Sequence, residues 1–419
     1  MYINWGGLFT RGNAFVSSVR PEARSVSTYT EKAVSAIQAM NDEFYNAATG
    51  TWDNAWWSSA NVCCGTLKVI IGYMKLTMVS QVVTTLSDFV TLELDEANKL
   101  NIGGILATTY TNAQKTTVHT MKTMTDGLVT SSYCLDSNSG CMMKRSFLGK
   151  RGFDNFLNEF YDDEGWWALA WIRASDATGD KQYLEAAIDI FNDMQTGTGT
   201  KCGGIRWKKE GEEGSDYVNA IANELYLMTA ASLARRVPNN ATYLDIAKKQ
   251  WNWFQDSGMI NEKGLINDGL TSDCKNNGLQ TWSYNQGVVL GGLVELALAT
   301  GDSNYTKKAH KIARAAIKEL SDDDGILIET DDCEHKDGHC GADGQQFKGI
   351  FVRNLRYLHT ISPKAEYRRF ITKNAISIWR NGRNDDNLLG VAWAGPYVTA
   401  TGPSHSSALD AIVAAIAVS

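Results

Sequence analysis

The sequence is poor in proline and contains no long apolar run. It has 5 prolines among 419 residues, no extended Gly/Ser or Pro tract, and no block of like charge of the kind that marks a tail. These absences argue against a linker between two domains, so we expect a single domain over residues 1–419. No apolar stretch reaches the roughly eighteen residues of a membrane-spanning helix, and residues 408–418 are too few for one.

Charge of either sign is not concentrated anywhere in the chain. The formal net charge is −7, and the lysines and arginines are dispersed. This pattern gives no electrostatic footprint for nucleic acid or for an anionic membrane, and a neutral polymer suits it better as a partner. Residues 1–25 contain arginine and glutamate and lack a continuous apolar segment, so no convincing signal peptide is visible.

The eight cysteines fall largely in loop-like sequence rich in Gly, Asp and Asn, where a disulfide would tie down a surface loop. The spacing does not fix their connectivity. The candidate bridges are Cys333–Cys340, Cys134–Cys141, and one that joins the loops of Cys202 and Cys274. Together with two glycosylation acceptor sequences, at 240–242 and 304–306, they lead us to expect a secreted or cell-wall protein.

A zinc site is the alternative interpretation of residues 333–340, which contain two cysteines and two histidines. All four side chains crowd one short loop, whereas zinc ligands usually lie on separate knuckles or on a helix. We therefore favour a disulfide there and predict no metal site. The chain also lacks a Gly-rich phosphate-binding motif, and we predict no cofactor.

Asp162 and Asp163 are adjacent at the start of a helical stretch that carries Trp166, Trp167 and Trp171. Glycosidic bond cleavage uses one carboxyl to protonate the leaving oxygen and a second to meet the positive charge at the anomeric carbon. Flat aromatic faces suit sugar rings, and an apolar wall can raise the pKa of one carboxyl. Other acidic runs in the chain lack this aromatic context. The pair therefore indicates sugar chemistry, with a solvated helix end as the alternative.

A structural unit recurs along the chain at nearly constant length. Similar segments place tyrosines at 183, 243, 305 and 367, which gives steps of 60, 62 and 62 residues. Each unit consists of an apolar helix, a turn and an amphipathic helix, which is a helical hairpin. The predicted helices are 29–45, 58–78, 113–126, 164–178, 181–195, 218–236, 242–257, 287–300, 304–320, 347–361, 364–381 and 405–418.

These twelve helices make six hairpins, which can close into an all-α (α/α)6 toroid. One helix of each pair would line the inside, and the loops gathered at one mouth would carry the site. An open solenoid is the alternative, but solenoid repeats are typically shorter than about 60 residues and need polar caps. We predict the closed toroid.

Several segments resemble glycoside hydrolase family 76, the endo-acting α-1,6-mannanases of bacteria and fungi. Residues 158–167 resemble the family's paired-aspartate motif, and residues 202–207 resemble its Gly-Gly-Ile-Arg-Trp loop. Further matches lie at 264–269, 281–287, 346–351 and 404–408. The resemblance runs in order from about residue 150 to the C-terminus, with a weaker match at 29–74. It implies an (α/α)6 barrel.

The resemblance also implies that internal α-1,6-mannosidic bonds are hydrolysed with retention, with Asp162 as the nucleophile and Asp163 as the acid/base. The residues themselves leave this open. Adjacent α-carbons lie roughly 3.8 Å apart, and side chains that diverge from them can reach the separation of about 5 to 5.5 Å of retaining enzymes or the larger one of inverting enzymes. Sequence does not distinguish nucleophile from acid in an adjacent pair.

Substrate contacts are expected from aromatic platforms and from polar partners for sugar hydroxyls. Trp167 and Trp171, one helical turn apart, are better interpreted as core, and Asn285 and Gln286 have the alternative role of capping a helix. The candidate platforms are Trp166, Trp207, Trp282 and Tyr284, and the candidate hydroxyl partners are Asp268, Asn285, Gln286 and Lys348.

Residues 79–150 are Thr-rich, match the family poorly and separate two hairpins by more than expected. We interpret this stretch as an irregular or inserted segment, or as an error in the gene model. Three functions remain open: a monomeric endo-α-1,6-mannanase acting on mannan, a cell-wall transglycosylase of the same family, and a mannan-binding protein without activity. The third would be expected to have lost one aspartate, and both are present.

Overall fold

Helices form almost all of the regular structure in the computed structural model, which describes residues 23–52, 80–114, 119–125, 128–134, 155–209, 216–336 and 339–419. The long helices are α1 (Ala23–Phe44), α2 (Ser80–Leu92), α4 (Ile102–Ala113), α5 (Tyr161–Thr178), α6 (Lys181–Met194), α7 (Ala220–Arg236), α8 (Ala241–Asp256), α9 (Ser283–Thr300), α10 (Asn304–Glu319), α12 (Phe347–Ile361), α13 (Ala365–Asn381) and α14 (Gly402–Val418). The described residues also form two short α-helices, α3 (Leu94–Lys99) and α11 (Gly341–Gly344), and two 3-10 helices, η2 (Gln195–Gly197) and η3 (Thr330–His335). Two hairpins pair β1 (Tyr45–Asn46) with β2 (Thr51–Trp52) and β3 (His119–Thr125) with β4 (Leu128–Cys134).

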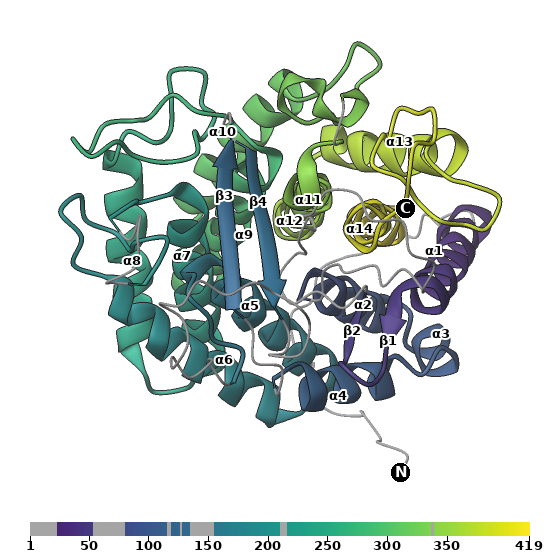
Figure 1. Ribbon diagram of the computed structural model, residues 1–419, viewed down its shortest axis with the longest axis horizontal. Helices are drawn as coiled ribbons and strands as arrows, with labels where there is room; N and C mark the ends of the chain where they lie inside the picture. The colour runs from purple at the N-terminus through teal and green to yellow at the C-terminus, as the bar shows by residue number, and fades with distance from the viewer. Residues whose placement is uncertain are drawn as a thin grey trace, which may run out of the picture.

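The long helices form two concentric rings. The inner ring is α2, α5, α7, α9, α12 and α14, each in contact with the next, and α14 closes on α2. The outer ring is α1, α4, α6, α8, α10 and α13 (Figure 1). Within the described residues, this arrangement is the predicted all-α (α/α)6 toroid.

Burial follows the two rings. In the inner helix α9, every residue from Ser283 to Ala297 is buried, as a helix surrounded by neighbours requires. In the outer helix α10, burial is confined to one face, which includes Ala309, Ala313 and Ala316. The core therefore lies within and between the rings.

The loop after each of four outer helices has the same construction. Isolated β-bridges hold Ile205, Ile266, Leu327 and Leu389, at steps of 61, 61 and 62 residues. Each of these four amides donates to a side chain from a neighbouring helix, namely Asn223, Gln286, Asn374 and His405. The periodicity of the tyrosines thus corresponds to a real structural repeat.

The first third of the chain departs from the predicted helix list. A helix at 113–126 is wrong, because α4 ends at Ala113 and His119–Thr125 forms a strand; threonine, which recurs there, favours strands. The inner helix α2 and the outer helix α4 both lie inside the stretch that the sequence set apart as irregular. The helix predicted at 58–78 lies outside the described residues.

Two of the predicted disulfides are confirmed. Cys202–Cys274 joins the loop after α6 to the loop before α9, and Cys333–Cys340 closes a short loop before α12. The zinc alternative for that loop is therefore not adopted. The predicted Cys134–Cys141 bridge involves a residue outside the described ranges. None of the helices described is long and apolar enough to cross a membrane.

Candidate active site

The first turn of α5 carries the two adjacent aspartates, and the loop between α6 and α7 holds that turn in place. Phe160 forms a β-bridge with Lys208, and the Tyr161 amide donates to the Trp207 carbonyl at 3.0 Å. Asp162 and Asp163 follow directly, where the partial positive charge of a helix N-terminus favours anionic side chains. The side chain of Trp207 is thereby fixed beside the acids.

Asp162 accepts hydrogen bonds from three separate groups. The Trp207 Nε1–H donates to its Oδ2 at 2.9 Å, and the Asp163 amide donates to its Oδ1 at 3.0 Å. The Lys122 ammonium lies 3.1 Å from each of its two oxygens. These three donors fix the orientation of the Asp162 carboxyl beside Asp163, as a positioned nucleophile requires.

Asp163 is more deeply buried and has a different environment. Its side chain is fully buried, with Oδ1 2.7 Å from Lys122 Nζ and Oδ2 accepting from Asn158 Nδ2 at 2.6 Å. Burial, opposed by the Lys122 ammonium and assisted by the charge on Asp162, raises the pKa of Asp163 to about 8. A carboxyl with such a pKa retains its proton at neutral pH, which is the form a general acid requires.

The shared lysine limits how far apart the two carboxyls can be. One ammonium lies 3.1 Å from Asp162 and 2.7 Å from Asp163. The two oxygens that it contacts are therefore no more than about 6 Å apart, which is near the separation of retaining glycosidases and below that of inverting ones.

Lys122 itself comes from β3, in the stretch that sequence analysis treated as irregular. Its side chain is 1% exposed, and it lies 4.6 Å from the Phe160 ring centroid and 5.5 Å from that of Trp207. Burial disfavours its charge, but Asp162 and Asp163 outweigh burial and raise the pKa of Lys122 well above its usual value. No signal in the sequence indicates this lysine. Asn158, by contrast, belongs to the paired-aspartate motif and could have been singled out.

The four predicted platforms do not share one environment. Trp207 is partly exposed beside the acids. Trp166, Trp282 and Tyr284 are buried, and Tyr284 stacks on Phe347 with ring centroids 3.8 Å apart. Trp166 lies 6.5 Å from Tyr284, so these rings form one cluster inside the mouth.

Trp167 and Trp171 occupy the core, as predicted. Both are fully buried, and their rings stack on each other with centroids 5.4 Å apart. They therefore stabilise α5 and have no open face for a ligand.

Asp268 lies in the same mouth, in the loop before α9. The Tyr217 hydroxyl donates to it, and Asn277 Nδ2 donates in turn to that hydroxyl at 3.0 Å. Burial, opposed by the Tyr217 hydrogen bond and assisted by the charge on Asp162, raises the pKa of Asp268 to about 6. The sequence indicated Asp268 but not Tyr217.

The other three predicted hydroxyl partners have different surroundings. Gln286 binds the backbone of Ile266 with both ends of its amide, at 2.8 and 2.9 Å. Lys348 is buried, 2.6 Å from Glu334 Oε1 and 2.9 Å from the Val391 carbonyl. These two side chains fasten loops to the inner helices.

Asn285 differs from both. It is fully buried, and neither of its amide atoms has a hydrogen-bond partner within the described part of the chain. Glu224 on α7 is also fully buried, with both carboxyl oxygens unpartnered among the described residues, and burial raises its pKa well above the usual value. Unpaired buried polar groups are costly, and here they lie on inner helices near the mouth.

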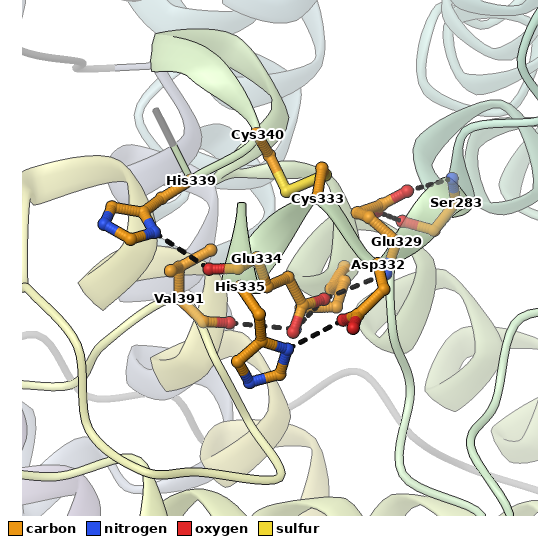
Figure 2. Close-up of a disulfide and its surroundings, with 10 residues drawn as sticks. Ser283, Glu329, Asp332, Cys333, Glu334, His335, His339, Cys340 and Val391 are labelled. Carbon is orange, nitrogen blue, oxygen red and sulfur yellow. Dashed lines mark hydrogen bonds and ion pairs between the residues drawn. A yellow bond between two sulfur atoms is a disulfide. The ribbon is translucent and has the colours of Figure 1, made fainter. Parts of the chain in front are cut away.

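The loop closed by Cys333–Cys340 supports the start of α9. Figure 2 shows Glu329 accepting from both the amide and the hydroxyl of Ser283, and the amide bond measures 3.1 Å. Glu334 accepts from the Glu329 amide at 2.8 Å and also binds Lys348. Burial, opposed by these Ser283 contacts, raises the pKa of Glu329 to about 7. Sequence analysis did not identify either glutamate.

A family model described as glycosyl hydrolase family 76 matches residues 106–418. A putative mannan endo-1,6-alpha-mannosidase of Schizosaccharomyces pombe is 33% identical over 214 residues, which are 48% of each chain. A mannan endo-1,6-alpha-mannosidase of Candida albicans is 29% identical over 268 residues, 57% of this chain and 58% of the relative. The chain thus spans about half the length of the curated relatives it matches.

Solved structures share the fold over most of the chain. The GH76A alpha-1,6-mannanase from Salegentibacter sp. HEL1_6 superposes with a TM-score of 0.69 at 20% identity, covering 93% of this chain and 100% of that one. Dfg5 from Chaetomium thermophilum superposes with a TM-score of 0.64 at 19% identity, covering 81% of this chain and 79% of that one.

Proposed function

This chain belongs to glycosyl hydrolase family 76, and we propose that it hydrolyses internal α-1,6-mannosidic bonds of mannan with retention of configuration. The observation that carries the proposal is the pair of carboxyls no more than about 6 Å apart with unlike environments, since a retaining enzyme needs both features.

The two aspartates would act in sequence. Asp162 attacks the anomeric carbon while Asp163 gives its proton to the departing glycosidic oxygen, so that a mannosyl ester forms on Asp162 and the cleaved chain leaves as an alcohol. Asp163, now ionised, takes a proton from water, whose oxygen attacks the anomeric carbon and breaks the ester. The pKa of about 8 for Asp163 supports its assignment as the acid, and the three donors to Asp162 support its assignment as the nucleophile.

The substrate assignment draws on the relatives. Those with 33% and 29% identity are described as mannan endo-1,6-alpha-mannosidases, and an inactive variant of the Salegentibacter enzyme is described in complex with alpha-1,6-mannotetrose. Trp207 is the best-placed platform because it is partly exposed beside the acids. Asp268 and Asn285 remain hydroxyl partners in our proposal, whereas the engaged groups of Gln286 and Lys348 favour supporting roles.

Transfer of the mannosyl group to a second sugar is the alternative outcome for the same intermediate. Asp163 is fully buried and Asp162 is 6% exposed, so little water reaches the site as it stands. A sugar acceptor that binds through several contacts can compete there with water. We further propose that the protein acts as a monomer outside the cytosol or at the cell wall, in keeping with the two disulfides among the described residues.

The test is product analysis with linear α-1,6-mannan. The wild type should release shorter oligosaccharides that initially have the α configuration, and products longer than the substrate would indicate transfer. Asp162→Asn and Asp163→Asn should each abolish release, whereas Asp385→Asn, in an exposed acidic pair far from the site in sequence, should not. If the wild type binds mannan but never turns it over, the enzyme assignment is wrong.

A further inference from the structure

The β3–β4 hairpin lies over the end of the ring at which α5 begins (Figure 1). The Lys122 side chain of β3 contacts both catalytic carboxyls. Its ammonium contacts Asp162 at 3.1 Å and Asp163 at 2.7 Å, and the side chain is 1% exposed. The site as described is therefore closed by a residue of the chain itself.

A substrate needs the space that this ammonium fills. The acid must come within hydrogen-bond distance of the glycosidic oxygen, and the nucleophile must face the anomeric carbon bonded to that oxygen. The bond to be broken thus lies between the two carboxyls, where Lys122 Nζ is already at hydrogen-bond distance from both. Lysine and sugar cannot occupy this position together.

Lys122 also opposes the protonation state that the reaction requires. An ammonium next to Asp163 favours the ionised carboxylate, whereas a general acid has to carry its proton. Among the described groups that contact Asp163, Lys122 and Asn158 lower its pKa, whereas the charge on Asp162 raises it. Removing the ammonium would both open the site and favour the protonated acid.

The hairpin is attached in a way that permits displacement. β3 and β4 pair with each other in an antiparallel two-stranded ribbon, and the short helix α11 is the main packing partner of β4 among the described elements. Two-stranded ribbons are only marginally stable by themselves. The contacts of Lys122 with the two carboxyls therefore help to hold this ribbon over the site.

We infer that the β3–β4 hairpin is a displaceable strap, and that Lys122 is a positioning residue which closes the active site until an incoming saccharide displaces its ammonium from Asp162 and Asp163. This inference rests on the proposed function for the identity of the saccharide, but not for the closure itself. Displacement releases Asp163 from its counter-charge at the moment when the acid is needed.

Lys122→Ala is the main test, with Lys122→Arg to restore the charge and Lys208→Met as a matched loss of another lysine near Phe160, at 5.2 Å from that ring. In the ligand-free protein, Lys122→Ala should speed amide hydrogen exchange in 119–125 and 128–134 by about tenfold, while exchange in the inner helices stays unchanged. Lys122→Arg and Lys208→Met should exchange like the wild type. Unchanged exchange in the hairpin of Lys122→Ala would overturn the strap.

The pH dependence of the reaction provides the second readout. At high pH, the fall of kcat/KM reports the pKa of Asp163 in the free enzyme, where Lys122 is beside it. The fall of kcat reports the pKa of Asp163 in the enzyme–substrate complex. In the wild type, kcat should therefore fall at a higher pH than kcat/KM does. In Lys122→Ala, both quantities should fall at that same higher pH, and KM should be several-fold lower than in the wild type. If both quantities already fall at the same pH in the wild type, or if KM rises in Lys122→Ala, Lys122 holds substrate and is not displaced.

The two hypotheses fail separately. If no variant binds or cleaves α-1,6-manno-oligosaccharides, the proposed function is wrong, and hydrogen exchange in the ligand-free protein still decides for or against the strap. If the wild type cleaves α-1,6-mannan, but exchange in the hairpin of Asp163→Asn does not increase when mannotetraose binds, the proposed function stands and the strap does not.

Discussion

Buried acidic side chains occur toward both ends of the inner ring, but the two sets have different partners. Toward the C-terminal ends of the inner helices, Asp88 contacts Arg173 and Arg356, and Glu295 contacts Arg235 and Arg236. Burial would raise the pKa of Asp88, but the two arginines outweigh it and hold that pKa below its usual value.

At the mouth the balance is reversed. Asp163, Asp268 and Glu329 are buried with fewer or weaker counter-charges, and burial raises the pKa of each. Burial by itself therefore does not determine the role of a carboxyl. A buried carboxyl that is paired with arginine stabilises the ring, whereas one that is incompletely paired can hold a proton near neutral pH. The following predictions test this contrast.

Asp163→Asn should have the largest effect on activity and a favourable effect on stability. Turnover of α-1,6-mannan should fall by about 10²- to 10⁴-fold, as expected for loss of a general acid. The pKa of Asp163 is raised to about 8 in the folded protein. Between the pKa of Asp163 in the unfolded chain and about pH 8, the folded wild type therefore binds one more proton than the unfolded chain. Over this window its free energy of unfolding falls by on the order of 1 kcal/mol per pH unit as pH rises.

The Asn variant lacks this slope, so its free energy of unfolding should exceed that of the wild type increasingly as pH rises toward 8. Urea unfolding at several pH values measures this difference. A variant that is less stable than the wild type at pH 8 would show that Asp163 is a structural acid like Asp88.

Asp88→Asn should lower the free energy of unfolding by about 3–5 kcal/mol, because it removes the counter-charge of the buried Arg356 and one of the two acidic partners of the partly buried Arg173. Denaturant unfolding at neutral pH measures the loss. The matched control is Asp176→Asn, whose side chain is 34% exposed beside Arg236 and whose loss should cost less than about 1 kcal/mol. Equal losses in the two variants would contradict the contrast.

Trp207→Phe keeps an aromatic ring beside the acids but removes the Nε1 donor to Asp162. We expect kcat/KM to fall by about 10- to 150-fold, since a hydrogen bond to a charged group contributes about 1.5–3 kcal/mol. The free energy of unfolding should change little. Trp52→Phe removes a comparable donor, to Asn41 at 2.8 Å, and should leave kcat/KM unaltered. A large stability loss in Trp207→Phe would instead assign the indole to the fold.

Glu329→Gln should have the smallest effect near pH 5, because an amide oxygen can still accept from Ser283 at the start of α9. The pKa of Glu329 is raised to about 7, so the wild type loses stability as pH rises from the unfolded pKa to about 7, and the variant does not. The two proteins should differ by less than about 1 kcal/mol at pH 5, and the variant should gain relative to the wild type at pH 8. Melting temperatures at both pH values test this.

Local patterns predicted much of the fold. The long helices from α5 to α14 match their predicted positions closely, because helical periodicity and turn residues are properties of short segments. The short helix α11 was not predicted. The Thr-rich stretch was harder: α2 and the β3–β4 hairpin were not predicted there, since their packing against α5, α14 and α11 lies in the rest of the chain.

The candidate site divides in the same way. Asp162, Asp163 and Trp207 lie in motifs that the sequence displays. Gln286 and Lys348 lie in such motifs too, but the structure gives them loop-fastening contacts that a motif does not reveal. Lys122 lies 40 residues before Asp162 in a stretch without a motif, so its contact with the pair could not be read from the sequence.

Helical hairpins and an adjacent acid pair among aromatic residues could be recognised from the amino-acid sequence, because both are patterns within short segments of the chain. Tertiary contacts make Asp163 the more deeply buried aspartate of the pair, surround Asp88 with arginines, and bring Lys122 onto both carboxyls. Burial and charge pairing depend on which distant segments the ring brings together, and these two quantities set the chemistry of a carboxyl.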